Sequence, residues 1–193
     1  MTKVLLTGFE PFGKATLNPS GEIVKQISGD NIVTAILPVA YAQSAERLLA
    51  LIAEHNPDVV ICLGQAEGRT HISPARIAIN LDDARLADNE GVIRNDVPIV
   101  VGGPVAYEST LPVKDIVQAI NDAGIPAAVS LSAGAFLCNH VFYVAQDHFK
   151  DTKVRSGFVH VPLMDEQAGE FPGLPTMPLD QMVKAVRAML EVL

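Results

Sequence analysis

Short apolar runs rich in β-branched residues alternate along the chain with longer stretches that have helical periodicity. The runs Lys3–Thr7, Ile32–Ile36 and Asp58–Gly64 are predicted to be buried strands, because short continuous apolar runs are typical of parallel sheets. Parallel strands must be joined by crossovers, which are usually helices. The alternation therefore predicts an α/β fold with a mainly parallel sheet covered by helices.

The stretches between these runs carry apolar residues three and four positions apart, as on one face of a helix. Such helices are predicted in residues 19–27, 45–55, 113–123 and 179–190, with a further helix around Cys138. Other strands are predicted in residues 77–81, 126–132 and 156–162, and residues 98–104 are predicted to form an edge strand or a hairpin arm. The irregular stretch 64–105 leaves room for a long functional loop.

The composition indicates one domain, over residues 1–193, in a cytoplasmic protein. The formal net charge is −8, from 14 basic and 22 acidic residues, and no cluster of Lys and Arg is dense enough to bind a nucleic acid backbone. No apolar run approaches the roughly 20 residues that cross a bilayer, so no membrane contact is expected. Because the N-terminus lacks the apolar segment of a secretory signal, we expect Cys62 and Cys138 to be free thiols.

The stretch "LSAGAFLCNHVFYV", residues 131–144, places Cys138 near the predicted start of a helix. If the helix begins near Phe136 or Leu137, unpaired backbone N–H groups and the positive end of the helix dipole favour the thiolate form of Cys138. The alternative is a buried cysteine on the apolar face of the helix. That description also suits Cys62, in the middle of a predicted strand.

A nucleophilic thiol needs a base, and His160 is the best placed of the five histidines. It lies near the carboxyl end of a predicted strand, the edge at which the active sites of open α/β sheets form. His140 is closer to Cys138 in sequence, but two steps along a helix turn the side chain by roughly 200°. His140 is therefore expected to face away from the thiol. The alternative for His160 is a hydrogen-bonded histidine in the core.

Other chemistries find less support in the sequence. No group of Cys, His, Asp and Glu has the spacing of a zinc site, and no glycine-rich stretch matches a phosphate loop or a dinucleotide fingerprint. We therefore expect no metal and no cofactor. Phe9 and Phe12 lie in the loop after the first predicted strand, where they either form an apolar wall for a ligand or pack under the loop.

Seven segments of the chain together resemble the pyroglutamyl peptidase I family of cytosolic cysteine peptidases. They occur in the family's order and cover nearly the whole chain: "LLTGFEPFG", "LNPS", "CLGQAEGR", "ISPARIAINLDDARLADNEG", "GGPVAYESTLPVK", "AGIPAAVSLSAGAFLCNHVFY" and "GFVHVP". The resemblance implies a three-layer α/β/α sandwich with a twisted central sheet, commonly assembled as a homotetramer. It also implies an enzyme that removes an N-terminal pyroglutamyl residue from peptides without a cofactor.

The resemblance assigns roles to individual residues of this chain. The family's nucleophile matches Cys138, and its general base and acid matches His160. The apolar pocket around the flat lactam ring matches Phe9, Phe12, Phe136 and Leu137.

Polar recognition of the lactam is implied in the same way. Asn18 and Gln65 match positions whose amides recognise the lactam N–H and carbonyl, and Arg85 matches an arginine near the catalytic cysteine. This set is chemically sensible, because a neutral lactam without a free amine needs an apolar slot and a few amide partners.

One position departs from the family pattern. Where the family has a Thr-Pro-Glu-Arg type sequence, this chain has Ser73, Pro74, Ala75 and Arg76, so Ala75 replaces the glutamate that orients the catalytic histidine. Loss of the acidic member of a serine triad lowers turnover on the order of 10⁴-fold. A cysteine enzyme is expected to lose less, because a thiol is more easily activated than a hydroxyl.

Three outcomes are open at this position. The chain is a peptidase that works with a Cys–His dyad, or Glu67, Asp82 or Asp88 replaces the missing acid, or the chain is a weakened or inactive relative that still binds pyroglutamyl peptides. We expect an active or weakly active peptidase, because the other matched residues are all present. A nucleotide-binding α/β protein is a more distant alternative that rests on the fold class alone.

Overall fold

A five-stranded sheet forms the centre of the protein in the computed structural model, which describes residues 2–193. The strand order is β2-β1-β3-β7-β4. Neighbouring strands are parallel except β4, which is antiparallel to β7. The strands are β1 (Val4–Phe9), β2 (Ile32–Leu37), β3 (Val59–Gln65), β4 (Ser73–Pro74) and β7 (Arg155–Val161).

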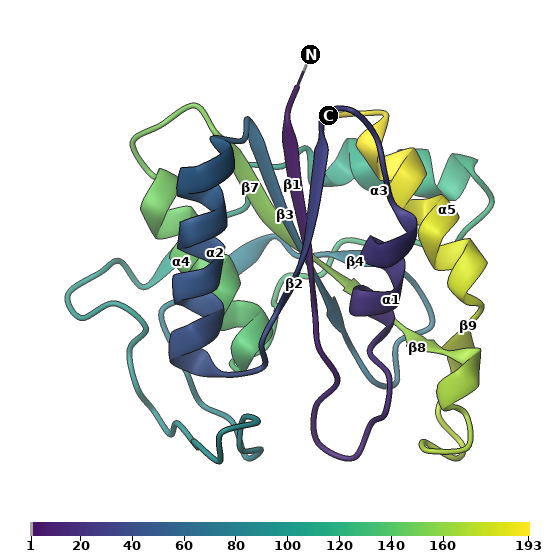
Figure 1. Cartoon of the computed structure of the whole chain (residues 1–193), viewed down its shortest axis with the longest axis horizontal. Coiled ribbons are helices and arrows are strands. Elements are labelled where there is room, and N and C mark those ends of the chain that lie inside the picture. The colour runs from purple at the N-terminus through teal and green to yellow at the C-terminus, as the bar shows by residue number, and fades with distance from the viewer. Residues whose placement is uncertain (1) are drawn as a thin grey trace.

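Helices cover both faces of this sheet and give the protein three layers (Figure 1). One face is covered by α1 (Pro19–Gln26), α3 (Val113–Asp122) and α5 (Leu179–Leu190), and the other by α2 (Tyr41–His55) and α4 (Leu137–Phe149). The predicted α/β fold with a mainly parallel sheet is confirmed, and so is the three-layer sandwich.

Side chains of the central strands enter two separate apolar layers, because successive residues of a strand point to opposite faces. In β1, Val4 and Leu6 pack in the layer beneath α1 and α5, whereas Leu5 packs in the layer beneath α2 and α4. All three side chains are buried. Burial on both faces explains why these strands are continuous apolar runs.

The direction of the chain's path across the sheet reverses at β1. From β1 the chain passes through α1 to β2, crosses to the other face through α2 and returns as β3 on the opposite side of β1. Such a reversal leaves a crevice outside the carboxyl ends of the two strands, the usual ligand site of open α/β sheets. Phe9 and Gln65 end β1 and β3, so they flank this crevice.

Two small sheets lie outside the main one: β5 (Ile77–Ile79) with β6 (Ala106–Glu108), and β8 (Leu163–Met164) with β9 (Thr176–Met177). A 3-10 helix, η1 (Asp165–Gln167), lies between β8 and β9. The strand predicted in residues 77–81 is thus shorter and does not join the main sheet. The edge strand predicted in residues 98–104 is wrong, because bends and a turn with Gly102 at φ +75° interrupt that run.

The regular strand predicted in residues 126–132 is also wrong. This segment is bonded to residues 72–76 by two isolated parallel bridges that flank Pro74. Ser130 N–H donates to the Pro74 carbonyl at 2.9 Å and Arg76 N–H donates to the Ser130 carbonyl at 2.7 Å, but Pro74 has no N–H for the bond between the two bridges. The missing donor interrupts the ladder, so the segment runs beside β4 without forming a sixth strand.

Asn139, fully buried in α4, fastens a neighbouring loop to this helix. Its Oδ1 accepts from the Ile79 N–H at 2.9 Å, and its Nδ2 donates to the carbonyls of Ile79 and Leu81 at 2.9 and 3.0 Å. These bonds hold the chain after β5 against the first turns of α4.

We expect Asn139→Ala to lower the free energy of unfolding by about 3 kcal/mol, because it leaves three backbone groups without partners. Urea denaturation followed by circular dichroism measures this loss. Replacement of the exposed Asn95 with alanine is the control, expected to change the free energy by less than about 0.5 kcal/mol. Equal losses in the two variants would contradict the role of Asn139.

Candidate active site

A cavity of about 400 Å³ lies at the crevice between β1 and β3. The ends of β1, β3 and β7 and the first turn of α4 all contribute to its walls. Eight of the site residues predicted from the sequence line it: Phe9, Phe12, Asn18, Gln65, Phe136, Leu137, Cys138 and His160. The fold thus brings together side chains that are far apart in the sequence.

Cys138 is the second residue of α4, with Phe136 as the N-cap, so the predicted helix start is confirmed. The sulfur packs against the backbone of β3 at Gly64, where an added methyl group would lie 2.7 Å from Sγ. Only glycine leaves room for so close an approach. Gly64 is paired with His160 in the sheet, so the thiol lies over the strand pair that carries the histidine.

Burial keeps both Cys138 and His160 uncharged near neutral pH. Burial, with a smaller contribution from Cys62, raises the pKa of the Cys138 thiol to about 12, although a backbone N–H and Arg69 act in the opposite direction. Burial, together with the positive charge of Arg69, lowers the pKa of His160 to about 3. The helix N-terminus therefore does not suffice to form a thiolate in the free protein.

His160 Nδ1 is buried and has no hydrogen-bond partner among residues 2–193. In β4, which is antiparallel to β7, Ser73 lies opposite His160, and the next residue but one, Ala75, donates its N–H to the Phe158 carbonyl at 2.8 Å. Residues two apart in paired strands share one face, so Ala75 lies on the same face as His160. The Ala75 methyl is fully buried and offers Nδ1 no acceptor.

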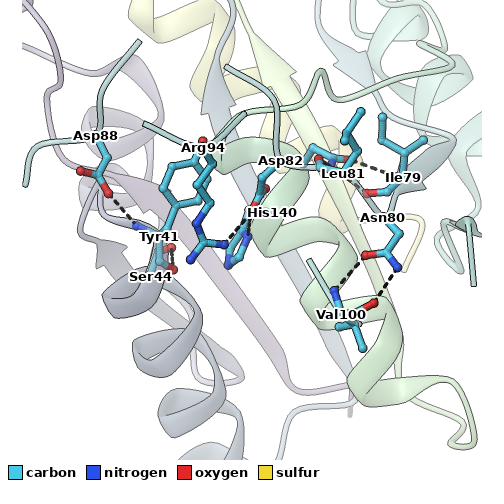
Figure 2. A network of polar contacts seen from close by, with 11 residues as sticks. Tyr41, Ser44, Ile79, Asn80, Leu81, Asp82, Asp88, Arg94, Val100 and His140 are labelled. Atoms are coloured by element: carbon cyan, nitrogen blue, oxygen red, sulfur yellow. Dashed lines mark hydrogen bonds and ion pairs between the residues drawn. The ribbon is translucent and has the colours of Figure 1, made fainter. Parts of the chain in front are cut away.

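Two of the acids proposed to replace the glutamate are engaged elsewhere (Figure 2). Asp82 is fully buried and bonds with Arg94 Nη1 at 2.7 Å and with His140 Nδ1 at 2.9 Å. Asp88 accepts from the Tyr41 N–H at 3.0 Å. His140 thus pairs with Asp82 and lies outside the cavity, as its place on the helix predicts.

Two charged side chains that follow β3, Glu67 and Arg69, line the cavity. Arg69 also donates to Ser130 Oγ at 3.2 Å. Arg85, by contrast, is exposed and does not line the cavity, so its predicted place near Cys138 is not supported by contact. Sequence reasoning missed Arg69, although its position just after the end of a central strand is a signal that could have found it.

Aromatic rings form one wall of the cavity. The ring centroids of Phe12 and Phe136 are 6.2 Å apart at an interplanar angle of 49°. The Tyr41 ring makes an edge contact with the Phe136 ring, and the two ring centroids are 5.7 Å apart. The arrangement leaves an apolar slot suited to a flat ring.

Two amide side chains complete the lining. Asn18 caps α1: its Oδ1 accepts from the N–H and the hydroxyl of Ser20, and its Nδ2 donates to the Glu10 carbonyl. Gln65 Nε2 is buried and has no hydrogen-bond partner in the described part of the chain. A buried donor of this kind is available to a ligand in the cavity.

Within residues 2–193, no group of three or more His, Cys, Asp and Glu side chains could hold a metal ion. None of the helices in this range is long and apolar enough to cross a membrane. Cys62 and Cys138 are both free, as predicted.

A thiol at the start of a helix with a histidine on the adjacent strand is an arrangement that cysteine-type hydrolases use. The family model described as pyroglutamyl peptidase matches residues 2–193. The pyrrolidone-carboxylate peptidase of Vibrio vulnificus strain YJ016 is 48% identical over 195 residues, which cover 98% of this chain and 92% of that protein.

Solved structures agree with the sequence comparison. The crystal structure of pyroglutamyl peptidase I from Bacillus amyloliquefaciens has a TM-score of 0.96 at 44% identity, covering 99% of this chain and 94% of that one. The pyrrolidone carboxyl peptidase from Thermococcus litoralis has a TM-score of 0.93 at 36% identity, with 100% and 93% covered. The chain therefore belongs to the pyroglutamyl peptidase family of cysteine-type hydrolases, and the resemblance of its seven segments is confirmed.

We expect His160 to make the protein less stable as the pH falls from about 6.5 towards about 3. The pKa of His160 is lower in the folded than in the unfolded chain, so the unfolded chain binds the extra proton in this window. His160 alone is expected to lower the free energy of unfolding by about 1.4 kcal/mol for each pH unit in this window. Urea denaturation at several pH values measures how the free energy of unfolding changes with pH, and His160→Gln should lack the part of this change that is due to His160. Identical slopes in the two proteins would contradict the low pKa.

Proposed function

We propose that the protein hydrolyses the bond after an N-terminal pyroglutamyl residue of peptides, with Cys138 as the nucleophile. The observation that carries the proposal is that Cys138 and His160 line one cavity, beside a Gln65 amide donor that has no partner among residues 2–193. A pyroglutamyl residue carries a neutral lactam and no free amine. An apolar slot with an amide donor fits such a group better than it fits a charged N-terminus.

In this proposal the flat lactam ring lies against the rings of Phe9, Phe12 and Phe136. Gln65 Nε2 donates to the lactam carbonyl. Ser20 engages both lone pairs of the Asn18 side-chain oxygen. Asn18 therefore offers the lactam the second hydrogen of Nδ2 and no acceptor.

The reaction begins from a neutral pair. His160 takes the thiol proton as the sulfur of Cys138 attacks the pyroglutamyl carbonyl carbon. Backbone N–H groups in the first turn of α4 lack helical partners and stabilise the oxyanion. His160 then gives its proton to the departing amine, the C–N bond breaks, and a thioester remains. A water molecule, deprotonated by His160, hydrolyses the thioester and restores the thiol.

Ala75 is expected to make this reaction slow. When His160 holds the thiol proton it is a buried cation, and its Nδ1–H needs an acceptor that Ala75 does not supply. We therefore infer a Cys138–His160 dyad with reduced turnover. The same missing acceptor favours the second candidate function, a protein that binds pyroglutamyl peptides without cleaving them.

Copies of the chain are proposed to associate as a homotetramer, as the family resemblance implies. Exposed apolar side chains in the loop between β5 and β6 support an association surface: Val101 and Val105 are 88% and 85% exposed, and Ile93 is 59% exposed. The cytoplasmic location stays a prediction from the sequence.

We expect Ala75→Glu to raise kcat on the order of 10- to 100-fold, because a carboxylate beside Nδ1 would stabilise the protonated His160. Release of a chromogenic amine from its pyroglutamyl derivative measures the rate. Cys138→Ala, which removes the nucleophile, is the control and should abolish turnover.

Two results would change the proposal. If the native chain bound a pyroglutamyl ligand tightly but released no amine, the peptidase would be wrong and the second candidate function would stand. If Ala75→Glu left the rate unchanged, the missing carboxylate would not be the defect. Glu67 would then be the acid to test, because it lines the cavity with His160.

A further inference from the structure

We propose that Gln167 is a positioning residue that determines which end of the Gln65 side-chain amide faces the substrate. The inference rests on the proposed function, in which Gln65 Nε2 donates to the lactam carbonyl. Gln167 ends η1, is fully buried and does not line the cavity, so any effect that it has on a substrate is indirect.

The amide of Gln167 has partners on both of its ends. Its Oε1 accepts from the Met164 N–H at 3.1 Å, and its Nε2 donates to the Leu17 carbonyl at 3.1 Å. Nε2 also donates to Gln65 Oε1 at 2.9 Å, across 102 positions of sequence. Segments on both sides of the cavity therefore meet at this one side chain.

Backbone partners fix the orientation of Gln167. The two ends of a glutamine amide have nearly the same shape, so only hydrogen bonding decides which end is oxygen. A backbone N–H can only donate and a carbonyl can only accept, so the bonds to Met164 and Leu17 permit one orientation. In that orientation Gln167 presents a donor to Gln65.

This donor fixes Gln65 in turn. The end of Gln65 that faces Gln167 must be the acceptor Oε1, so the other end of this cavity-lining side chain is the donor Nε2. Nε2 is buried without a partner in residues 2–193, as expected of a donor held ready for a ligand. In the flipped orientation Oε1 would face the lactam carbonyl, and two acceptors would meet.

The test compares Gln167→Glu with Gln65→Met and with the double variant. A carboxylate at position 167 cannot donate to Gln65 Oε1, so Gln65 turns its Nε2 towards residue 167. We expect Gln167→Glu and Gln65→Met each to lower kcat/KM for a pyroglutamyl substrate about tenfold or more, mainly through KM. The double variant should be no worse than Gln65→Met alone, because Gln167 acts through Gln65.

Gln146 provides a matched control. It is also buried, and its Nε2 donates to the Ser156 carbonyl at 2.6 Å, but it lies outside the cavity. Gln146→Met should lower the melting temperature while leaving kcat/KM within about twofold. If Gln167→Glu does not fold, Gln167→Met replaces it, with an expected several-fold loss because Gln65 is then free to take either orientation.

Binding of pyroglutamyl-alanine to the same variants in a Cys138→Ala background, measured by calorimetry, separates this inference from the proposed function. Absence of turnover in the native chain would overturn only the peptidase, since the dissociation constants would still report the orientation of Gln65. An unchanged dissociation constant in both Gln167 variants would overturn the inference. So would losses from Gln167→Glu and Gln65→Met that multiply in the double variant.

Discussion

The contact between the Cys138 sulfur and the backbone of β3 at Gly64 is the constraint on which the rest of the site depends. Because Gly64 has no side chain, the first turn of α4 can approach the sheet until the Cys138 sulfur packs against β3. Strand register then places His160, the proposed base, as the direct neighbour of Gly64 in β7. The presence of the thiol and the imidazole in one cavity therefore follows from the packing of α4 on the sheet.

Close packing also determines the protonation of the pair. Burial disfavours both the thiolate of Cys138 and the imidazolium of His160. In the proposed reaction, proton transfer therefore accompanies attack on the substrate. A carboxylate beside His160 Nδ1 would stabilise the protonated imidazole at that step, but the Ala75 side chain has no acceptor, and Nδ1 has no partner among residues 2–193. Asp82 is already bonded to the Arg94 and His140 side chains.

Features with a local signal could be predicted from the sequence. Short apolar runs were sufficient to predict the four long strands of the main sheet, and the spacing of apolar residues was sufficient for α1, α2, α3 and α5. Features that depend on contacts between residues far apart in the sequence could not be predicted in this way. Pro74 interrupts a ladder only because residues 126–132 run beside it, and the path of a loop decides that Arg69 rather than Arg85 lines the cavity. The bond from Gln167 to Gln65 likewise exists only in the folded chain.

Mass spectrometry of the intact protein, acid-quenched during turnover of a pyroglutamyl substrate, tests the central claim most directly. The account predicts a mass increase of one pyroglutamyl acyl group, located on Cys138, removed by hydroxylamine and absent from Cys138→Ala. Amine release that persists in Cys138→Ala, or an acyl group found on another residue such as Cys62, would contradict it.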